Sequence, residues 1–338
     1  MKQERPKISD VARIAGVSTA TVSRAISNPG LVSNETRAAV QEAIRATGYR
    51  LNHAARNLRH RRTGGIVALV PNLANPFFSK ILSGIASVLG PAGYNLLVAD
   101  THTTGADALL SYAEPSRADG LIILDGNLSS EALVAGRVPL VEACEWVPGL
   151  SAPRIKIDNR GAAALAIDHL VSLGHRRIGH VTGPQGNVLA IARLAGVRDA
   201  LQQKGLMLDE TAVYPGDFTL ESGRAAGESW LQQPQAIRPT AMFLASDEMA
   251  CGFIGELQRH GIRVPEDMSV VGFDDIELVA HISPPLTTVR QPRAEIGRVA
   301  AKRMLAVIAG QSEATDTILP VELVIRESTA APAAQNKS

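Results

Sequence analysis

One segment of the sequence combines amide and aromatic side chains in a pattern suited to binding a sugar. Residues 72–78 read Asn-Leu-Ala-Asn-Pro-Phe-Phe, and the whole chain holds only six Phe. The C–H faces of a sugar ring pack on aromatic rings, while amide groups hydrogen-bond its hydroxyls. Asn75, Phe77 and Phe78 are therefore candidate ligand-binding residues. One of the two Phe is expected to close a hydrophobic core instead, and we favour Phe78 for the binding surface.

A second segment carries side chains suited to contacting DNA bases. Ser18 can cap a short helix over residues 19–26, in which Val22, Ala25 and Ile26 recur at core-facing positions. The other face of this helix is short and polar, with a single charge: Thr19, Ala20, Thr21, Ser23 and Arg24. Such a face lies deep in a major groove, where Thr or Ala meets a thymine methyl group and Arg meets guanine.

The sequence lacks the motifs of several common enzyme classes. It contains no Gly-Lys-Ser/Thr phosphate loop, no His-Glu-x-x-His and no nucleophile elbow. Cys144 and Cys251 are the only cysteines, which excludes a disulfide framework and a Cys-rich metal site. We therefore expect a protein that is not an enzyme, with no catalytic residue, no metal site and no cofactor.

The charge is unevenly distributed along the chain. Residues 1–62 hold 12 Lys and Arg against 4 Asp and Glu, a net charge of +8, whereas the remainder carries 22 against 29, a net charge of −7. A small basic module on a large acidic body indicates a polyanion-binding head. Because the start of the chain is charged and no apolar run could span a bilayer, we expect a cytoplasmic protein with no membrane contact.

The basic module has the pattern of a helix-turn-helix. Ser9 or Asp10 is expected to cap a first helix that Gly16 ends in a left-handed turn. Its apolar face comprises Val11, Ala12, Ile14 and Ala15. A third helix is predicted from Asn34 to Gly48, with Val40, Ala43 and Ile44 inward. The alternative is a three-helix bundle with no role in nucleic-acid binding, which the charge of the module disfavours.

From residue 63 the pattern changes to alternating strands and helices. Strands are predicted over residues 65–70, 95–99, 121–124, 177–181, 241–245 and 269–273, and a helix follows the first strand from about Phe77 to Leu89. Such repetition predicts parallel sheets with ligand sites at the carboxyl ends of the strands. About 270 residues exceed one such sheet, so we expect two similar lobes facing a cleft. This body alone would also suit a transport-type sugar-binding protein, which the basic head argues against.

These motifs together resemble the LacI/GalR family of transcriptional regulators over about residues 7–330. The headpiece likeness is carried by residues 10–12, 15–18, 21–24 and 32–37. The body resembles a periplasmic-binding-protein-like effector domain at residues 157–159, 173–178, 193–196, 246–250, 271–275 and 284–289. The resemblance implies a homodimer that binds double-stranded operator DNA and a small-molecule effector.

The same resemblance identifies residues 48–58 as a hinge, in which Leu58 matches a leucine that wedges into the minor groove. A wedge of this kind partly unstacks a base step and kinks the duplex. Leu51 departs from the family, which often has proline there. The predicted DNA-binding residues are Ser18, Thr19, Ala20, Thr21, Ser23, Arg24, Asn28, Asn52, His53, Ala55 and Leu58.

The resemblance also implies residues that bind the effector. Arg193 matches an effector-binding arginine and Asp274 an acidic residue that accepts bonds from hydroxyls, while Asp275 is expected to be structural. Ser246 and Gln291 complete the predicted set, with Cys144 and Glu145 as weaker candidates. Within the family the chain is most similar to a nucleoside-responsive member, which favours a nucleoside or a pentose. Cys144, Leu189 and Ile191 depart from that likeness, and a sugar acid remains the alternative.

The predicted organisation follows from these assignments. We expect a DNA-binding headpiece over residues 1–50, a hinge over residues 51–63, and an effector-binding and dimerisation domain over residues 64–332, followed by a tail over residues 333–338. Lobe 1 of that domain is predicted over about residues 64–159 and 291–319. Lobe 2 is predicted over about residues 160–290 and 320–332.

Overall fold

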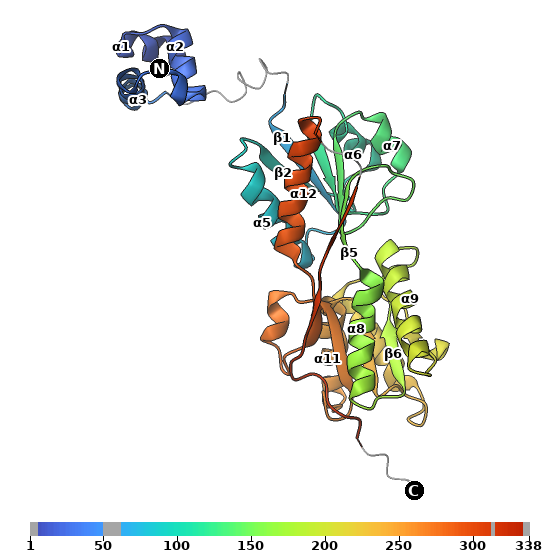
Figure 1. Cartoon of the computed structure of the whole chain (residues 1–338). Coiled ribbons are helices and arrows are strands. Elements are labelled where there is room, and N and C mark those ends of the chain that lie inside the picture. The colour runs from blue at the N-terminus through green and yellow to red at the C-terminus, as the bar shows by residue number, and fades with distance from the viewer. Residues whose placement is uncertain (1–5, 50–61, 312–314, 334–338) are drawn as a thin grey trace. The chain divides into compact units, whose positions relative to one another are not determined.

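The computed structural model describes residues 6–49, 62–311 and 315–333. Contacts divide the chain into two compact units, residues 1–61 and residues 62–338 (Figure 1). The predicted fold class, a helical headpiece followed by an α/β body with two largely parallel sheets, is confirmed.

The first unit consists of short helices around a small core. Its elements are α1 (Ile8–Ala15), α2 (Thr19–Ser27), the 3₁₀ turn η1 (Pro29–Leu31) and α3 (Asn34–Thr47). Val11, Val22 and Val40 form the centre of the core, one from each α-helix. Gly16 follows α1 with φ of 66°, a left-handed conformation that allows the sharp turn into α2.

Two predictions about α1 are wrong. The helix begins at Ile8, so its N-cap is Lys7 rather than Ser9 or Asp10, and the Asp10 carboxylate instead accepts a hydrogen bond from the Lys7 N–H at 2.9 Å. Ile14 is 50% exposed. The buried face of α1 centres on Val11, Ala12 and Ala15, and at 3.6 residues per turn Ile14 lies roughly 100° away from that centre.

Lobe 1 of the second unit is built on a parallel sheet with the strand order β11-β5-β4-β3-β1-β2. Its strands are β1 (Gly65–Val70), β2 (Asn95–Asp100), β3 (Gly120–Ile123), β4 (Leu140–Ala143), β5 (Arg154–Ile157) and β11 (Asp316–Leu319). Its helices are α5 (Phe77–Leu89), α6 (Ala106–Tyr112), α7 (Ser130–Ala135) and α12 (Arg293–Ile308).

The alternation of side chains along β1 explains the layers of lobe 1. Ile66, Ala68 and Val70 belong to the core that α5 and α12 cover, whereas Val67 and Leu69 belong to the core under α6 and α7. The sheet is therefore buried on both faces at β1, which is why this strand has a continuous apolar sequence.

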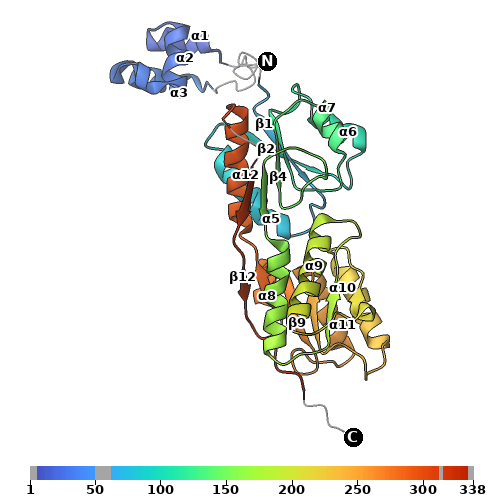
Figure 2. The ribbon, with the colours of Figure 1, turned by 45° about the vertical axis from the view of Figure 1, so that its right-hand side comes forward.

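Helices α5 and α12 lie side by side on one face of lobe 1 (Figures 1 and 2). Two glycines allow this close approach. A Cβ on Gly84 would lie 2.2 Å from the Ala294 carbonyl oxygen, and one on Gly297 would lie 2.1 Å from that of Ile81. Any larger residue at either position would force the helices apart.

Lobe 2 is built on a second sheet with the order β12-β10-β9-β8-β6-β7, parallel except for the β10–β12 pair. Its strands are β6 (Ile178–Val181), β7 (Val213–Tyr214), β8 (Ala241–Leu244), β9 (Ser269–Asp274), β10 (Thr287–Arg290) and β12 (Glu322–Val324). Its helices are α8 (Asn159–Ser172), α9 (Val188–Gln203), α10 (Leu220–Gln232) and α11 (Asp247–Arg259), with the 3₁₀ turns η2 (Glu210–Ala212) and η3 (Glu277–Ala280).

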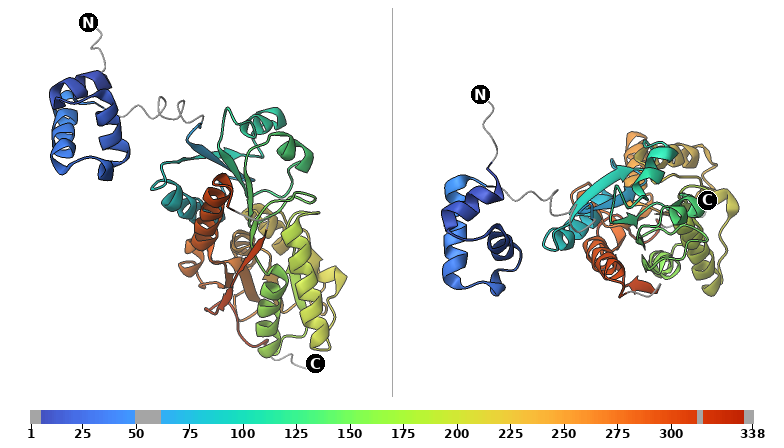
Figure 3. Two further views of the ribbon diagram at one scale, coloured as in Figure 1. Left: turned by 45° about the horizontal axis from the view of Figure 1, so that its top comes forward. Right: turned by 90° about the horizontal axis from the view of Figure 1, so that it is seen from above.

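The chain changes lobe after β5, after β10 and after β11. Helices α8 and α9 lie side by side in lobe 2, in green and yellow-green in Figure 3. Helices α10 and α11 pack against one another in the same lobe. Apart from β12, the strands of each sheet run parallel, so the loops at their carboxyl ends lie at one edge of each sheet, where ligands bind in such folds.

Candidate functional sites

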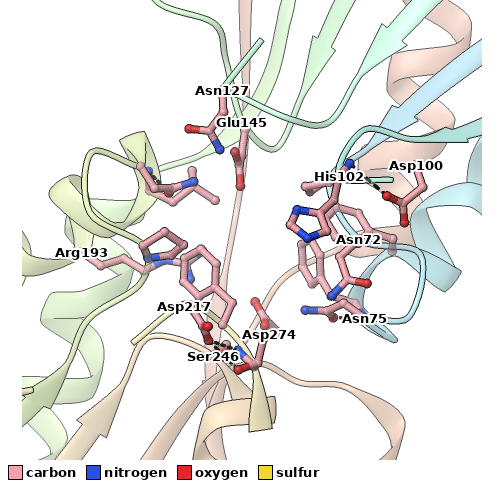
Figure 4. A pocket seen from close by; sticks show the side chains of 18 of the residues that line it. Asn72, Asn75, Asp100, His102, Asn127, Glu145, Arg193, Asp217, Ser246 and Asp274 are labelled. Atoms are coloured by element: carbon pink, nitrogen blue, oxygen red, sulfur yellow. Dashed lines mark hydrogen bonds between the residues drawn. The ribbon is translucent and has the colours of Figure 1, made fainter. Parts of the chain in front are cut away.

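A cavity of about 560 Å³ lies between the two lobes and is lined by residues of both. Asn72 follows β1, His102 follows β2 and Glu145 follows β4 in lobe 1, while Asp217 follows β7 and Ser246 follows β8 in lobe 2 (Figure 4). These are the loops after the carboxyl ends of the strands, where ligands bind in open α/β sheets. The volume falls within the range of about 300–1,000 Å³ that small-molecule sites occupy.

The structure brings most of the predicted effector-binding residues together. The predicted residues that line the cavity are Asn75, Phe77, Phe78, Glu145, Arg193, Ser246 and Asp274. Cys144 and Gln291 are not among the lining residues. Cys144 belongs to the hydrophobic core instead, and burial raises the pKa of its thiol. Gln291 donates a hydrogen bond from Nε2 to Oδ1 of Asp274 at 2.7 Å, so it supports a lining residue.

The aromatic pair of lobe 1 lies at the start of α5. The rings of Phe77 and Phe78 meet edge to face, with centroids 5.1 Å apart. Asn75 accepts a hydrogen bond from the Phe77 N–H at 2.8 Å, which fixes the loop before the helix. Each ring is 7% exposed and belongs to the core, yet both line the cavity. The structure thus gives both phenylalanines the two roles between which the sequence suggested a choice.

Arg193 is buried in the wall of lobe 2 although it carries a charge. It is 2% exposed, its Nε donates to Asn159 Oδ1 at 2.9 Å, and its Nη1 donates to the Ala245 carbonyl. The guanidinium lies over the Phe273 ring, 3.7 Å from its centroid. Burial lowers the pKa of Arg193, and the charge of Asp274 opposes this shift. A guanidinium stays protonated in proteins, so the wall presents an oriented cation to the cavity.

Asp274 ends β9 next to this cation. Its φ of 118° is a conformation that L residues rarely adopt, and backbone strain of this kind concentrates at functional sites. Burial raises the pKa of Asp274 to about 6, and Arg193 and Gln291 limit the rise. Asp275 pairs with Arg290 and Arg326, each at 2.6 Å, in the structural role expected for it.

Several residues that line the cavity are not among the predicted effector-binding residues. They are Asn72, Asp100, His102, Asn127, Asn187, Asp217 and Phe218 among others. Phe218 follows β7, which is only two residues long and gave no strand pattern. Its φ is 68°, and a Cβ on Gly183 would lie 2.2 Å from its ring. The pairing of an aromatic residue with a glycine that makes room for its ring is a long-range feature, absent from local sequence.

The first unit presents the face of α2 that was predicted to contact bases. Thr19, Ala20, Arg24 and Asn28 are exposed, and Thr21 and Ser23 are half-buried. Ser18 caps the helix, accepting a hydrogen bond from the Thr21 N–H at 3.1 Å. The other predicted DNA-binding residues lie outside the described part of the chain: Asn52, His53, Ala55 and Leu58.

No group of His, Cys, Asp and Glu in residues 6–49, 62–311 and 315–333 is arranged to hold a metal ion. Within these ranges there is also no helix of sufficient length and apolarity to cross a membrane.

Comparison with known proteins identifies relatives along nearly the whole chain. Residues 7–52 match the family model described as bacterial regulatory proteins, lacI family, and residues 167–329 match that of a periplasmic binding protein-like domain. The transcriptional repressor CytR of Escherichia coli is 39% identical over 96% of both chains. The ribose operon repressor of Haemophilus influenzae is 35% identical over 95% of this chain and 98% of its own.

A solved structure of the lac repressor dimer, bound to its operator and an anti-inducer, is also similar. It covers 97% of this chain and 100% of its own, with a TM-score of 0.84 and 31% identity.

Proposed function

Because this chain belongs to the lacI family of bacterial regulatory proteins, we propose that it controls transcription by binding a pseudo-palindromic operator as a dimer. Helix α2 enters the major groove of each half-site, and two such helices lie about one duplex turn apart. The relatives named above are regulators, and this chain likewise acts by binding rather than by catalysis.

The observation that carries the effector part of this proposal is the cavity between the lobes. Its lining residues come from both sheets, so a bound molecule contacts both lobes at once. A ligand shifts a conformational equilibrium only by its difference in affinity for the two states. An effector that bridges the lobes has this difference, because its contacts depend on how the lobes are arranged.

The effector is a small molecule rich in hydroxyl groups. Aromatic rings on the lobe 1 wall suit the C–H faces of a sugar ring, while Arg193 and Asp274 provide donors and acceptors for its hydroxyls. We favour a nucleoside or a pentose, and a regulator of a carbohydrate operon that responds to a sugar or a sugar acid is the alternative. The similarity to CytR and to a ribose operon repressor supports the first choice.

Gel retardation with DNA from upstream of the protein's own and neighbouring genes tests the regulator assignment. We expect binding of at least one fragment with an affinity on the order of 10⁻⁸ M or tighter, and a change in that affinity when the effector is added. Failure to bind any fragment would overturn the assignment.

Substitution of Arg24 tests whether α2 reads the bases. Arg24→Ala should weaken operator binding by roughly tenfold or more, since one base contact contributes about 1–3 kcal/mol. Non-specific DNA binding should change little. Arg45→Ala is the matched control, because Arg45 is an exposed arginine of α3 paired with Glu42.

The hinge assignment of Leu58 is tested in the same way, and equal losses of specific and non-specific binding by Leu58→Ala would contradict it.

A further inference from the structure

The charges around the cavity are strongly unbalanced. Among the described residues that line it, Asp100, Glu145, Asp217 and Asp274 carry carboxyl groups, and Arg193 carries the one guanidinium. Two of the carboxyl groups come from each lobe (Figure 4). A ligand that enters the cavity therefore meets acidic groups on both walls.

Hydrogen bonds hold two of these carboxyl groups in the ionised form. The backbone N–H groups of Leu73, His102 and Thr103 donate to Asp100 at 2.9–3.0 Å and lower its pKa. Burial opposes the ionisation of Asp217, but bonds from Ser222 and Thr219 outweigh it and leave its pKa below the ordinary value. Both groups are anionic at neutral pH, and among the residues that the structure describes neither has a cation as a hydrogen-bond partner.

The other two carboxyl groups lie beside Arg193. Glu145 is 7% exposed and accepts a hydrogen bond from the Gly126 N–H at 2.9 Å, and Asp274 is 6% exposed. Burial raises the pKa of both carboxyl groups, and the charge of Arg193 limits the rise, while their charges in turn favour the charged form of Arg193. The single cation is thus already compensated by its own neighbours. Its Nε and Nη1 atoms also already donate hydrogen bonds, to Asn159 and to the Ala245 carbonyl respectively.

We propose that the cavity selects effectors without negative charge, namely neutral polyhydroxylated molecules such as nucleosides or pentoses, and rejects sugar acids, sugar phosphates and nucleotides. This proposal rests on the assignment of the cavity as the effector site. An anionic group in the cavity would lose its hydration and face like charges, where the effective dielectric constant is well below that of water. Hydroxyl and amino groups instead donate to the carboxylates and keep them hydrogen-bonded.

Calorimetric titration of the full-length protein at pH 7.5 with matched pairs of ligands tests this selection. Two pairs differ in charge and little in shape: ribonate with ribonamide, and glucuronate with glucuronamide. Ribose and the common ribonucleosides are each compared with the 5-phosphate ester, which differs in both charge and size. For the pairs that bind, we expect the neutral member to bind more tightly by about tenfold or more, as one uncompensated like-charge contact would produce. Equal or tighter binding of an anionic member would overturn the proposal. The absence of detectable binding by every neutral ligand would also overturn it.

A charge-neutralising double variant, Glu145→Gln with Asp217→Asn, tests whether the carboxylates cause the rejection. The ratio of neutral to anionic affinity should fall by about tenfold, because two like charges are removed with little change in shape. Asp209→Asn is the control, since Asp209 is an exposed carboxylate that caps η2. A loss of stability alone would weaken both ligands of a pair and leave their ratio unchanged, and an unchanged ratio would contradict the proposal.

DNA retardation with the same preparation separates this inference from the proposed function. If the protein binds no operator but discriminates between the paired ligands, the proposed selectivity holds and the assignment as a regulator fails. If it binds operator and responds to an anionic ligand, the assignment as a regulator holds and the proposed selectivity fails.

Discussion

The wall that lobe 2 contributes to the cavity differs from the wall of lobe 1 in how its polar groups are held. Most polar groups of the lobe 2 wall are buried: Asn187, Arg193, Ser246 and Asp274 are each at most 6% exposed, although Asp217 is exposed, whereas Glu145 is the buried polar residue of the lobe 1 wall. In lobe 1 the amides and the imidazole lie on loops, with His102 and Asn127 exposed. Buried polar groups keep one orientation because any other would leave a donor or acceptor without a partner. Lobe 2 therefore offers the effector a preformed surface, and lobe 1 a more adaptable one.

The largest effect is expected from removing the cation of lobe 2. Arg193→Ala should lower the affinity for the effector by about 100-fold or more, because it removes the charged donors of this wall, and a hydrogen bond to a charged group contributes about 1.5–3 kcal/mol. Calorimetry with the effector measures the loss. Arg198→Ala is the matched control on the same helix, since Arg198 is half-exposed and pairs with Glu210. A loss below about fivefold for Arg193→Ala would show that lobe 2 is not the dominant wall.

A smaller effect is expected from neutralising the carboxylate next to it. Asp274→Asn keeps the shape and tolerates the positive φ, so the change is mainly in charge. We expect a loss of effector affinity of about 10–100-fold, since a hydrogen bond to a charged group contributes about 1.5–3 kcal/mol.

Asp275→Asn is the control for Asp274→Asn, because it also has a positive φ but pairs with Arg290 and Arg326 instead of lining the cavity. This variant should lower the melting temperature more than it lowers effector affinity. If Asp275→Asn reduced the affinity as strongly as Asp274→Asn, the effect would arise from the stability of the loop rather than from the charge in the cavity.

The comparison of walls also explains what the sequence could predict. Strands that are buried on two faces, such as β1 and β8, have continuous apolar runs, and the sequence predicts them with small errors at their ends. The half-exposed strands β11 and β12 have no such run and were not predicted. Phe77 and Phe78 were found because they follow such a strand directly. The environment of Arg193 was not predictable, because Asn159, Ala245 and Phe273 reach it from distant parts of the chain.

Cys144 and Glu145 are neighbours in the sequence but differ in their positions relative to the cavity, and this difference was also not predictable from local sequence. Both were candidates, yet Glu145 lines the cavity and Cys144 lies in the core. Cys144 has φ of 68°, so the chain turns sharply after β4. No glycine or asparagine occupies this position, so local sequence propensity does not predict the turn. The Asp217–Phe218 loop was overlooked because the two-residue strand before it is too short to produce a periodic pattern.

Removing an aromatic ring from the lobe 1 wall should have an intermediate effect on the affinity for the effector. Phe78→Leu keeps most of the volume but removes the flat ring, and we expect a loss of effector affinity of about tenfold, from lost ring contacts of about 0.5–1.5 kcal/mol plus the lost apolar area. Phe253→Leu is the control, since Phe253 is fully buried in the core of lobe 2 and does not line the cavity. Equal losses from both variants would point to stability and not to contact with the ligand.

The smallest effect is expected from an exposed amide of lobe 1. Asn127→Ala removes a side chain that water can replace, and a net loss of about 1 kcal/mol corresponds to about fivefold weaker effector binding. Asn95→Ala is the control, because Asn95 is an exposed asparagine of β2 that does not line the cavity. Titration of both variants beside Arg193→Ala compares the two walls directly. Since a preformed wall loses more when one of its groups is removed, a loss for Asn127→Ala as large as that for Arg193→Ala would mean that lobe 1 also binds through fixed polar groups, and the distinction between the walls would fail.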